Sequence, residues 1–191
     1  MIQSASLNGL KVARGGEFGL TMHVFDSSDV SDSVAAAFRY LDMADLLECA
    51  WTAAKIEYKA EPCHRITIDF LSPAELKWQD RVLRQPHFPA LFARARDRVA
   101  TLAVDSAEWD FKRLGDLAAQ VKMVACDVQT VEVERKSSRT GQRHGLGGFV
   151  GSATYEGDLD ELLPILQAAQ YTGIGRHTAW GNGAIRVQMG A

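Results

Sequence analysis

The sequence predicts an α+β fold over residues 62–191, in which a four-stranded antiparallel sheet carries two helices on one face. Short runs of alternating apolar and polar residues indicate strands, and two longer runs place apolar residues at helical intervals. In chain order the segments are strand, helix, strand, strand, helix and strand. This is the order of the split βαβ, ferredoxin-like unit.

The first strand and the first helix are the best-marked elements. Residues 66–70 alternate in polarity before Ser72 and Pro73 end the run, which is typical of a half-buried strand. Residues 88–102 follow as a helix, and Pro89 falls in its first turn, where a missing N–H costs nothing. The apolar side of that helix is formed by Phe88, Leu91, Phe92, Ala95, Val99 and Leu102.

The second half of the unit is predicted from its strands. Residues 121–135 and 148–155 are rich in strand formers, and the Gly-, Ser- and Arg-rich segment 136–147 joins them as a long hairpin loop. Residues 159–171 are predicted to form a helix that Asp158 or Asp160 caps. A glycine-rich loop and a last strand, AIRVQM, close the chain.

Residues 1–61 predict a second, partial ferredoxin-like unit. A strand is expected at 17–26, and the helical periodicity of 30–55 fits one long helix or two shorter ones. Pro62 marks the boundary between the two domains, 1–61 and 62–191, because the residue before a proline is pushed out of helical geometry.

Composition excludes several classes of protein. With 191 residues, 47% apolar and 24% charged, the chain is globular rather than disordered or fibrous. Three widely spaced cysteines, Cys49, Cys63 and Cys126, form neither a disulfide framework nor a four-ligand zinc site. We expect no membrane span, because no apolar run approaches the length of ~18 residues that a span needs, and no signal peptide. We also expect a cytoplasmic location and neither a metal nor a cofactor.

The net charge of −3 hides a strong local asymmetry. Residues 135–155 contain no acid, and residues 172–191 add Arg176 and Arg186, also without an acid. The first stretch carries Arg135, Lys136, Arg139 and Arg143. Unless this cluster is only the solvated tip of a hairpin, it predicts an anionic partner.

The glycine-rich loop, YTGIGRHTAWGNG, has the spacing G-x-G-x5-G-x-G, formed by Gly173, Gly175, Gly181 and Gly183. Glycines permit positive φ angles, and successive amide N–H groups can then hold phosphate oxygens, with Arg176 adding charge and Trp180 a stacking face. The simpler interpretation is that the glycines only allow tight packing. Dinucleotide and P-loop sites are excluded, because they need a strand before the glycines and a helix after them.

Three motifs in this order resemble the CRISPR-associated endoribonucleases that cut repeat RNA, members of the RAMP superfamily. The glycine-rich loop resembles the terminal G-h-G-x5-G-h-G motif of that family, where h is hydrophobic, with Asn182 as a departure. The segment RHGLGGFVGSATYEGDL resembles its basic loop and following strand. The strand ITIDFLSPAEL and the helix PHFPALFARARDRVATL resemble its opening strand, turn and first helix.

This resemblance implies tandem ferredoxin-like domains that hold an RNA repeat against the two loops. It also implies cleavage without a metal, by attack of the ribose 2′-OH on the adjacent phosphate. The basic loop and the glycine-rich loop would then bind the RNA, and the partners would be CRISPR repeat RNA and other proteins of CRISPR effector complexes. Members of the family usually carry the catalytic histidine on the first helix of the N-terminal domain, a helix to which nothing in residues 1–61 corresponds.

His144 and His177 are the catalytic candidates that remain, because each lies beside an arginine in a predicted RNA-binding loop. RNA contact is the alternative role for both. At the level of the whole chain, a non-catalytic RNA-binding or scaffold subunit of a CRISPR ribonucleoprotein is the alternative to an endoribonuclease. A third possibility is a domain that binds a nucleotide metabolite or a protein.

Overall fold

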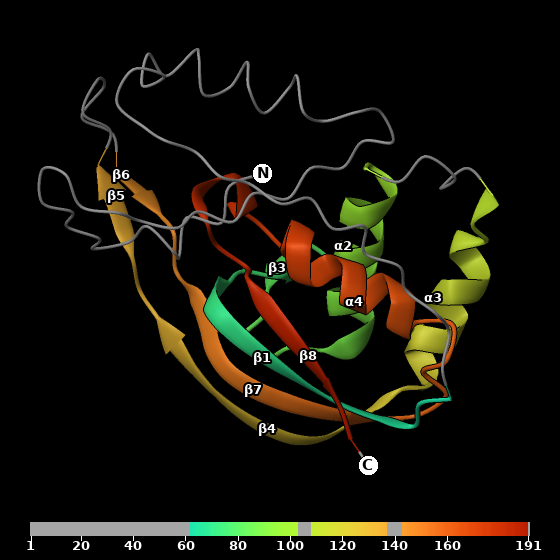
Figure 1. The fold of residues 1–191 in the computed structure, drawn as a ribbon. Coiled ribbons are helices and arrows are strands. Elements are labelled where there is room, and N and C mark those ends of the chain that lie inside the picture. Colours follow the sequence, from blue (N-terminus) through green and yellow to red (C-terminus); the bar gives the residue numbers. More distant parts are fainter. Residues whose placement is uncertain (1–61, 103–107, 137–142, 191) are drawn as a thin grey trace, which may run out of the picture.

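The computed structural model describes residues 62–102, 108–136 and 143–190 (Figure 1). The predicted partial unit at 1–61 lies outside them. In chain order, the described elements are β1 (Arg65–Ala74), β2 (Lys77–Trp78), β3 (Arg81–Val82), α2 (Phe88–Ala100), α3 (Phe111–Gln120), β4 (Lys122–Val131), β5 (Glu134–Lys136), β6 (Arg143–Gly145), β7 (Gly148–Glu156), α4 (Leu163–Thr172), the short 3₁₀ helix η3 (Thr178–Trp180) and β8 (Ile185–Met189).

The main sheet has four strands in the order β4-β7-β1-β8, and every neighbouring pair is antiparallel. In the central strand, Ile68 lies opposite Ala153 of β7 on one side and Val187 of β8 on the other. With α2 between β1 and β4, and α4 between β7 and β8, this is the predicted ferredoxin-like arrangement. The predicted fold class is confirmed.

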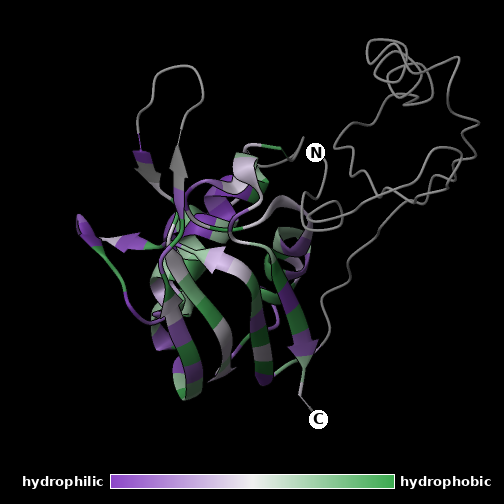
Figure 2. Ribbon diagram, turned by 90° about the vertical axis from the view of Figure 1, so that its left-hand side faces the viewer, coloured by the Kyte–Doolittle hydropathy of each residue, from purple (hydrophilic) through white to green (hydrophobic). Residues whose placement is uncertain are grey.

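The core lies between the sheet and the helices, which cover one face of it (Figure 1). Ile66, Ile68 and Phe70 of β1 are buried toward the helices, while Thr67 and Asp69 between them point to the opposite face, as the period of a strand requires. The strands in Figure 2 are banded green and purple for the same reason. Burying these side chains, at about 25 cal/mol per Å² of apolar surface, is the main stabilising term.

Tyr155 of β7 ties the sheet to the start of α2. Its ring lies 4.9 Å from the ring of Phe88, and its buried hydroxyl donates a hydrogen bond to Pro86 O at 2.7 Å. Burial raises the pKa of the Tyr155 hydroxyl well above its ordinary value. The predicted start of the helix is confirmed, because α2 begins at Phe88 with Pro89 in its first turn.

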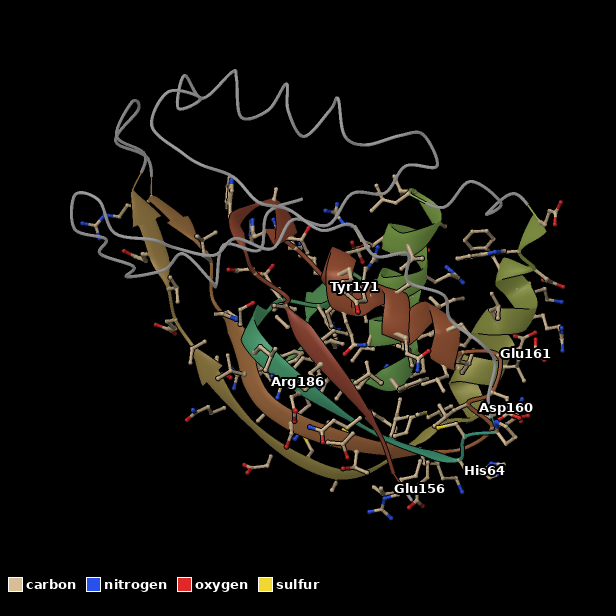
Figure 3. The ribbon with its side chains drawn as sticks, viewed as in Figure 1. His64, Glu156, Asp160, Glu161, Tyr171 and Arg186 are labelled. Carbon is tan, nitrogen blue, oxygen red and sulfur yellow. The ribbon has the colours of Figure 1, made fainter. Side chains whose placement is uncertain are left out.

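The start of α4 differs from the prediction. The helix begins at Leu163 rather than at residue 159, and no side chain caps it. Asp160 instead accepts a hydrogen bond from the backbone N–H of Cys63 at 2.7 Å, close to His64 in Figure 3, so that its carboxylate anchors the segment before β1. Pro164 in the first turn sets the start of the helix. The prediction of a cap at Asp158 or Asp160 is therefore wrong.

Several elements were not predicted. Helix α3 is capped by Asp110, whose carboxylate accepts from Arg113 N at 2.9 Å, and a small hairpin of β2 and β3 follows β1. The strand predicted at 121–135 ends at Val131, and its last residues form β5. Strand β5 pairs with β6, so the predicted loop contains a short two-stranded ribbon.

In the described part of the chain, no helix is long and apolar enough to cross a membrane.

Candidate nucleic-acid interface

The glycines of the glycine-rich loop (173–183) adopt the predicted positive φ angles, 71° at Gly173, 76° at Gly175, 89° at Gly181 and 73° at Gly183. A Cβ atom at Gly183 would lie 1.9 Å from Ile174 O, and one at Gly175 would lie 2.5 Å from Glu75 O. Only glycine fits these two positions, because both the backbone angle and the space exclude a side chain.

Most amide N–H groups of this loop are used inside the protein. Ile174 N donates to Gly183 O at 2.9 Å, Arg176 N to Glu75 O at 3.1 Å, and Gly183 N to Pro73 O at 2.9 Å. The amides that also donate to backbone carbonyls are those of Gly173, Trp180, Gly181 and Asn182. These N–H groups are not available to a phosphate, so an anion can be held only by the remaining amides of the loop and by side chains.

Ser72, at the end of β1, holds the glycine-rich loop in place. Its hydroxyl donates to Gly181 O at 2.8 Å and accepts from Ala184 N at 2.9 Å. Leu71 N also donates to Ala184 O at 2.8 Å. The last residues of β1 therefore fix the loop where it joins β8. From the sequence, Ser72 and Pro73 are expected to end the strand, but β1 continues to Ala74, and a contact across more than a hundred residues leaves no local pattern.

The glycine-rich loop and the basic loop (135–147) meet at their bases. Asn182 Nδ2 donates to Leu146 O at 2.8 Å, and Leu146 N donates to Val133 O at 2.6 Å. Both loops therefore lie at one end of the sheet (Figure 1). Asn182, the residue that departs from the family pattern, makes the contact. The bases of the two loops are therefore in contact, whereas the tip of the basic loop, residues 137–142, lies outside the described residues.

The charges of the two loops are partly neutralised. Arg143 pairs with Glu134 at 3.0 Å, and Arg176 pairs with Glu75. The expectation that no acid opposes these arginines is therefore wrong for both. The two pairs differ in exposure. The side chains of Arg143 and Glu134 are 71% and 65% exposed, whereas that of Glu75 is only 13% exposed. An exposed pair contributes at most about 1 kcal/mol, so a phosphate can displace Glu134 at low cost.

The remaining predicted residues are placed as follows. Arg135 lies opposite His144 in the β5–β6 register, and Lys136 lies opposite Arg143. Arg139 lies outside the described residues. Arg186 is exposed on β8, three positions after Gly183, and lies opposite Asp69 of β1 in the sheet register (Figure 3). The described part of the basic loop thus brings Arg135, Lys136, Arg143 and His144 onto one short ribbon.

His177 has a left-handed backbone, with φ of 64°, and its ring stacks on that of Trp180. The ring centroids are 5.1 Å apart and the planes differ by 4°. Trp180 is 45% exposed. The loop therefore presents an imidazole and an indole in one stack next to Arg176. In residues 62–102, 108–136 and 143–190, no group of three or more His, Cys, Asp or Glu side chains is arranged to hold a metal ion.

The fold and the two joined loops define a ferredoxin-like protein of the RAMP class. The family model of the CRISPR-associated endoribonuclease Cas6 matches residues 68–185, and the chain belongs to this family. No curated protein matches the chain. The matched segment contains β1 from Ile68 onward, the glycine-rich loop and the described residues of the basic loop, which are the segments that the motifs singled out.

Solved structures agree with the fold. Thermus thermophilus Cas6 (TTHB231) is similar with a TM-score of 0.55 and 18% identity, over 68% of this chain and 55% of that one. A Cas6 (TTHB231) product complex is similar with the same TM-score and identity, over 68% and 53%. An H37A mutant of Cas6 (TTHA0078) follows, with a TM-score of 0.50 and 17% identity, over 67% and 54%. The matched part of this chain spans about half the length of these structures.

Proposed function

We propose that this chain binds CRISPR repeat RNA and cleaves precursor CRISPR RNA without a metal ion. In this reaction the ribose 2′-OH attacks the adjacent phosphate, the bond to the 5′-oxygen breaks, and the products carry a 2′,3′-cyclic phosphate and a 5′-OH. Membership of the Cas6 family supports the substrate. The contact between Asn182 and Leu146 is the observation that carries the proposal, because it joins a basic surface and a stacking surface into one interface.

The RNA backbone would follow the basic loop. Arg135, Lys136, Arg139 and Arg143 supply positive charge, and a phosphate takes the place of Glu134 beside Arg143. The glycine-rich loop adds Arg176 and the exposed indole of Trp180, on which an unpaired base stacks. Gly173, Gly175, Gly181 and Gly183 contribute by allowing this loop to stay close to the turn after β1.

Cleavage needs a base for the 2′-OH proton, an acid for the leaving 5′-oxygen, and positive charge on the phosphorane. We assign the proton transfers to His144 and His177, since an imidazole changes charge near neutral pH. In one order, the neutral ring of His177 accepts the 2′-OH proton and the protonated ring of His144 donates to the 5′-oxygen. Arg143 and Arg176 stabilise the extra negative charge of the transition state.

The test uses end-labelled repeat RNA in buffer that contains EDTA. A product that ends in a 2′,3′-cyclic phosphate supports the proposal. Replacing His177 or His144 with Ala should then abolish cleavage and leave RNA affinity within about five-fold, since the arginines and Trp180 remain and the loss of one contact costs about 1 kcal/mol. Wild-type RNA that shifts in a gel but stays intact would instead identify a non-catalytic RNA-binding subunit. Tight binding of mononucleotides without affinity for RNA would contradict both functions.

A further inference from the structure

A cavity of about 390 Å³ lies beside the candidate interface. Its walls come from β3 and the residues after it, from the end of β4, and from the start of β7. Most of the lining is apolar and includes Val82, Leu83, Val131 and Phe149. This volume is within the range of about 300–1,000 Å³ that is typical of sites for small organic groups. Val82 is 55% exposed, so the cavity has a mouth on the surface.

The cavity shares residues with the interface. Glu75 lines the cavity and also pairs with Arg176 of the glycine-rich loop. Gly147 and Gly148 line it too, and they directly follow Leu146, which accepts the hydrogen bond from Asn182. An RNA strand that crosses the junction of the two loops would therefore pass next to the mouth of this cavity.

The charged residues of the lining differ from those of the loops. Arg84 and Glu132 are exposed, and within the described ranges neither has an ion-pair partner within 4.0 Å, unlike Arg143 and Arg176. An arginine without an ion-pair partner beside an apolar cavity can bind the phosphate of a nucleotide whose base lies in the cavity. A carboxylate such as that of Glu132 accepts hydrogen bonds from the amino group of a base, but repels a phosphate.

We propose that this cavity binds one unpaired nucleobase of the RNA, with Arg84 on the adjoining phosphate and Glu132 on an amino group of the base. The occupant is therefore adenine, cytosine or guanine rather than uracil, which has no amino group. Recognition of unpaired bases by insertion between side chains is the usual way in which proteins read single-stranded RNA. The inference rests on the proposed function, because it needs RNA at the junction of the loops.

The experiment measures the affinity of the full chain for repeat RNA in which each unpaired nucleotide in turn is made abasic. Besides the position whose base stacks on Trp180, one further position should lose roughly ten-fold in affinity, since stacking of one base on side chains contributes about 1–3 kcal/mol. The same position should lose affinity when its base is replaced by uracil. We call the loss of affinity on removal of the base the abasic penalty. In Thr130→Trp, a tryptophan at an exposed strand position fills the cavity. The abasic penalty at the sensitive RNA position should then disappear.

Arg84→Ala gives a second test that does not depend on filling the cavity, and it should reduce the abasic penalty because the nucleotide is no longer fixed. Arg81→Ala is the matched control. This arginine lies on the same hairpin and is exposed, but does not line the cavity, so its removal should leave the penalty unchanged.

The outcomes separate the two proposals. RNA binding in which every abasic penalty is retained by both cavity variants would overturn the inference and leave the proposed function standing. Absence of any RNA binding by the wild-type chain would overturn both.

Discussion

The carboxylate of Glu134 lies 3.0 Å from the guanidinium of Arg143, where it occupies the place that the proposal gives to an RNA phosphate. Replacing Glu134 with Gln keeps the shape of the side chain and removes its charge. RNA affinity should rise about three- to ten-fold. Arg143 no longer has to give up the Glu134 carboxylate to bind a phosphate, and the carboxylate no longer repels the RNA. Fluorescence anisotropy with labelled repeat RNA at low and high salt measures the change.

Glu161→Gln is the matched control for this experiment. Glu161 also pairs with an arginine, Arg113, but it lies at the start of α4, far from the basic loop (Figures 1 and 3). The control should leave RNA affinity unchanged. Equal effects of the two substitutions would mean that only the net charge of the protein matters, and would remove Glu134 from the interface.

Gly183→Ala should destabilise the protein by about 2 kcal/mol or more, because the new Cβ meets Ile174 O and the backbone stays at a positive φ. Gly145→Ala is the control, since a Cβ at that glycine meets nothing within 4 Å. Urea denaturation followed by circular dichroism compares the two. Similar midpoints for both variants would contradict the packing of the glycine-rich loop described above.

Ser72→Ala should weaken RNA binding and loosen the glycine-rich loop, because Gly181 O and Ala184 N lose their shared partner at a cost of about 1–3 kcal/mol. Hydrogen exchange at Ala184 should become faster, and Ser72→Thr, which restores a hydroxyl, should reverse both effects. Thr67→Val is the control, because it removes a hydroxyl contact of 3.0 Å with Thr154 on the open face of the sheet. Loss of RNA affinity in the Thr67 variant would show that the effect is not specific to the loop.

Tyr155→Phe tests the buried hydroxyl. At neutral pH the variant should be less stable by about 1–2 kcal/mol, since Pro86 O loses its donor. Burial raises the pKa of Tyr155 in the folded state, so above a pH of about 10 only the unfolded chain ionises there, and stability falls as the pH rises. The wild type should therefore lose its advantage over the variant in alkaline solution. A constant difference between the two proteins at every pH would contradict this account.

The sheet and α2 could be predicted from the sequence because their signals are local. Alternation in residues 66–70 and helical spacing after Phe88 depend only on near neighbours, and both elements are found where they were expected. The start of α4 could not be predicted, because Asp160 bonds to Cys63, which lies 97 positions away. Helix α3 could also have been predicted from local signals, because Asp110 can cap it and Phe111, Leu114 and Ala118 recur at helical spacing.

The candidate site could be located from the sequence, but not its charge. The basic loop and the glycine-rich loop were recognised by composition and spacing. The acid that opposes Arg176 could not be recognised, since Glu75 lies 101 positions away in the chain. Glu134 is close in sequence to Arg143 and lies next to the start of the acid-free stretch, so counting charges within that stretch alone missed it.

The anchoring of the glycine-rich loop by Ser72 and the turn after β1 limits how this motif can be engineered. A synthetic peptide of residues 171–185 would lack the partners of Gly181, Gly183 and Ala184 and would not keep the geometry seen in the whole chain. Transplanting the motif into another scaffold would therefore require residues 71–76 as a second graft, held at the same distance by the host.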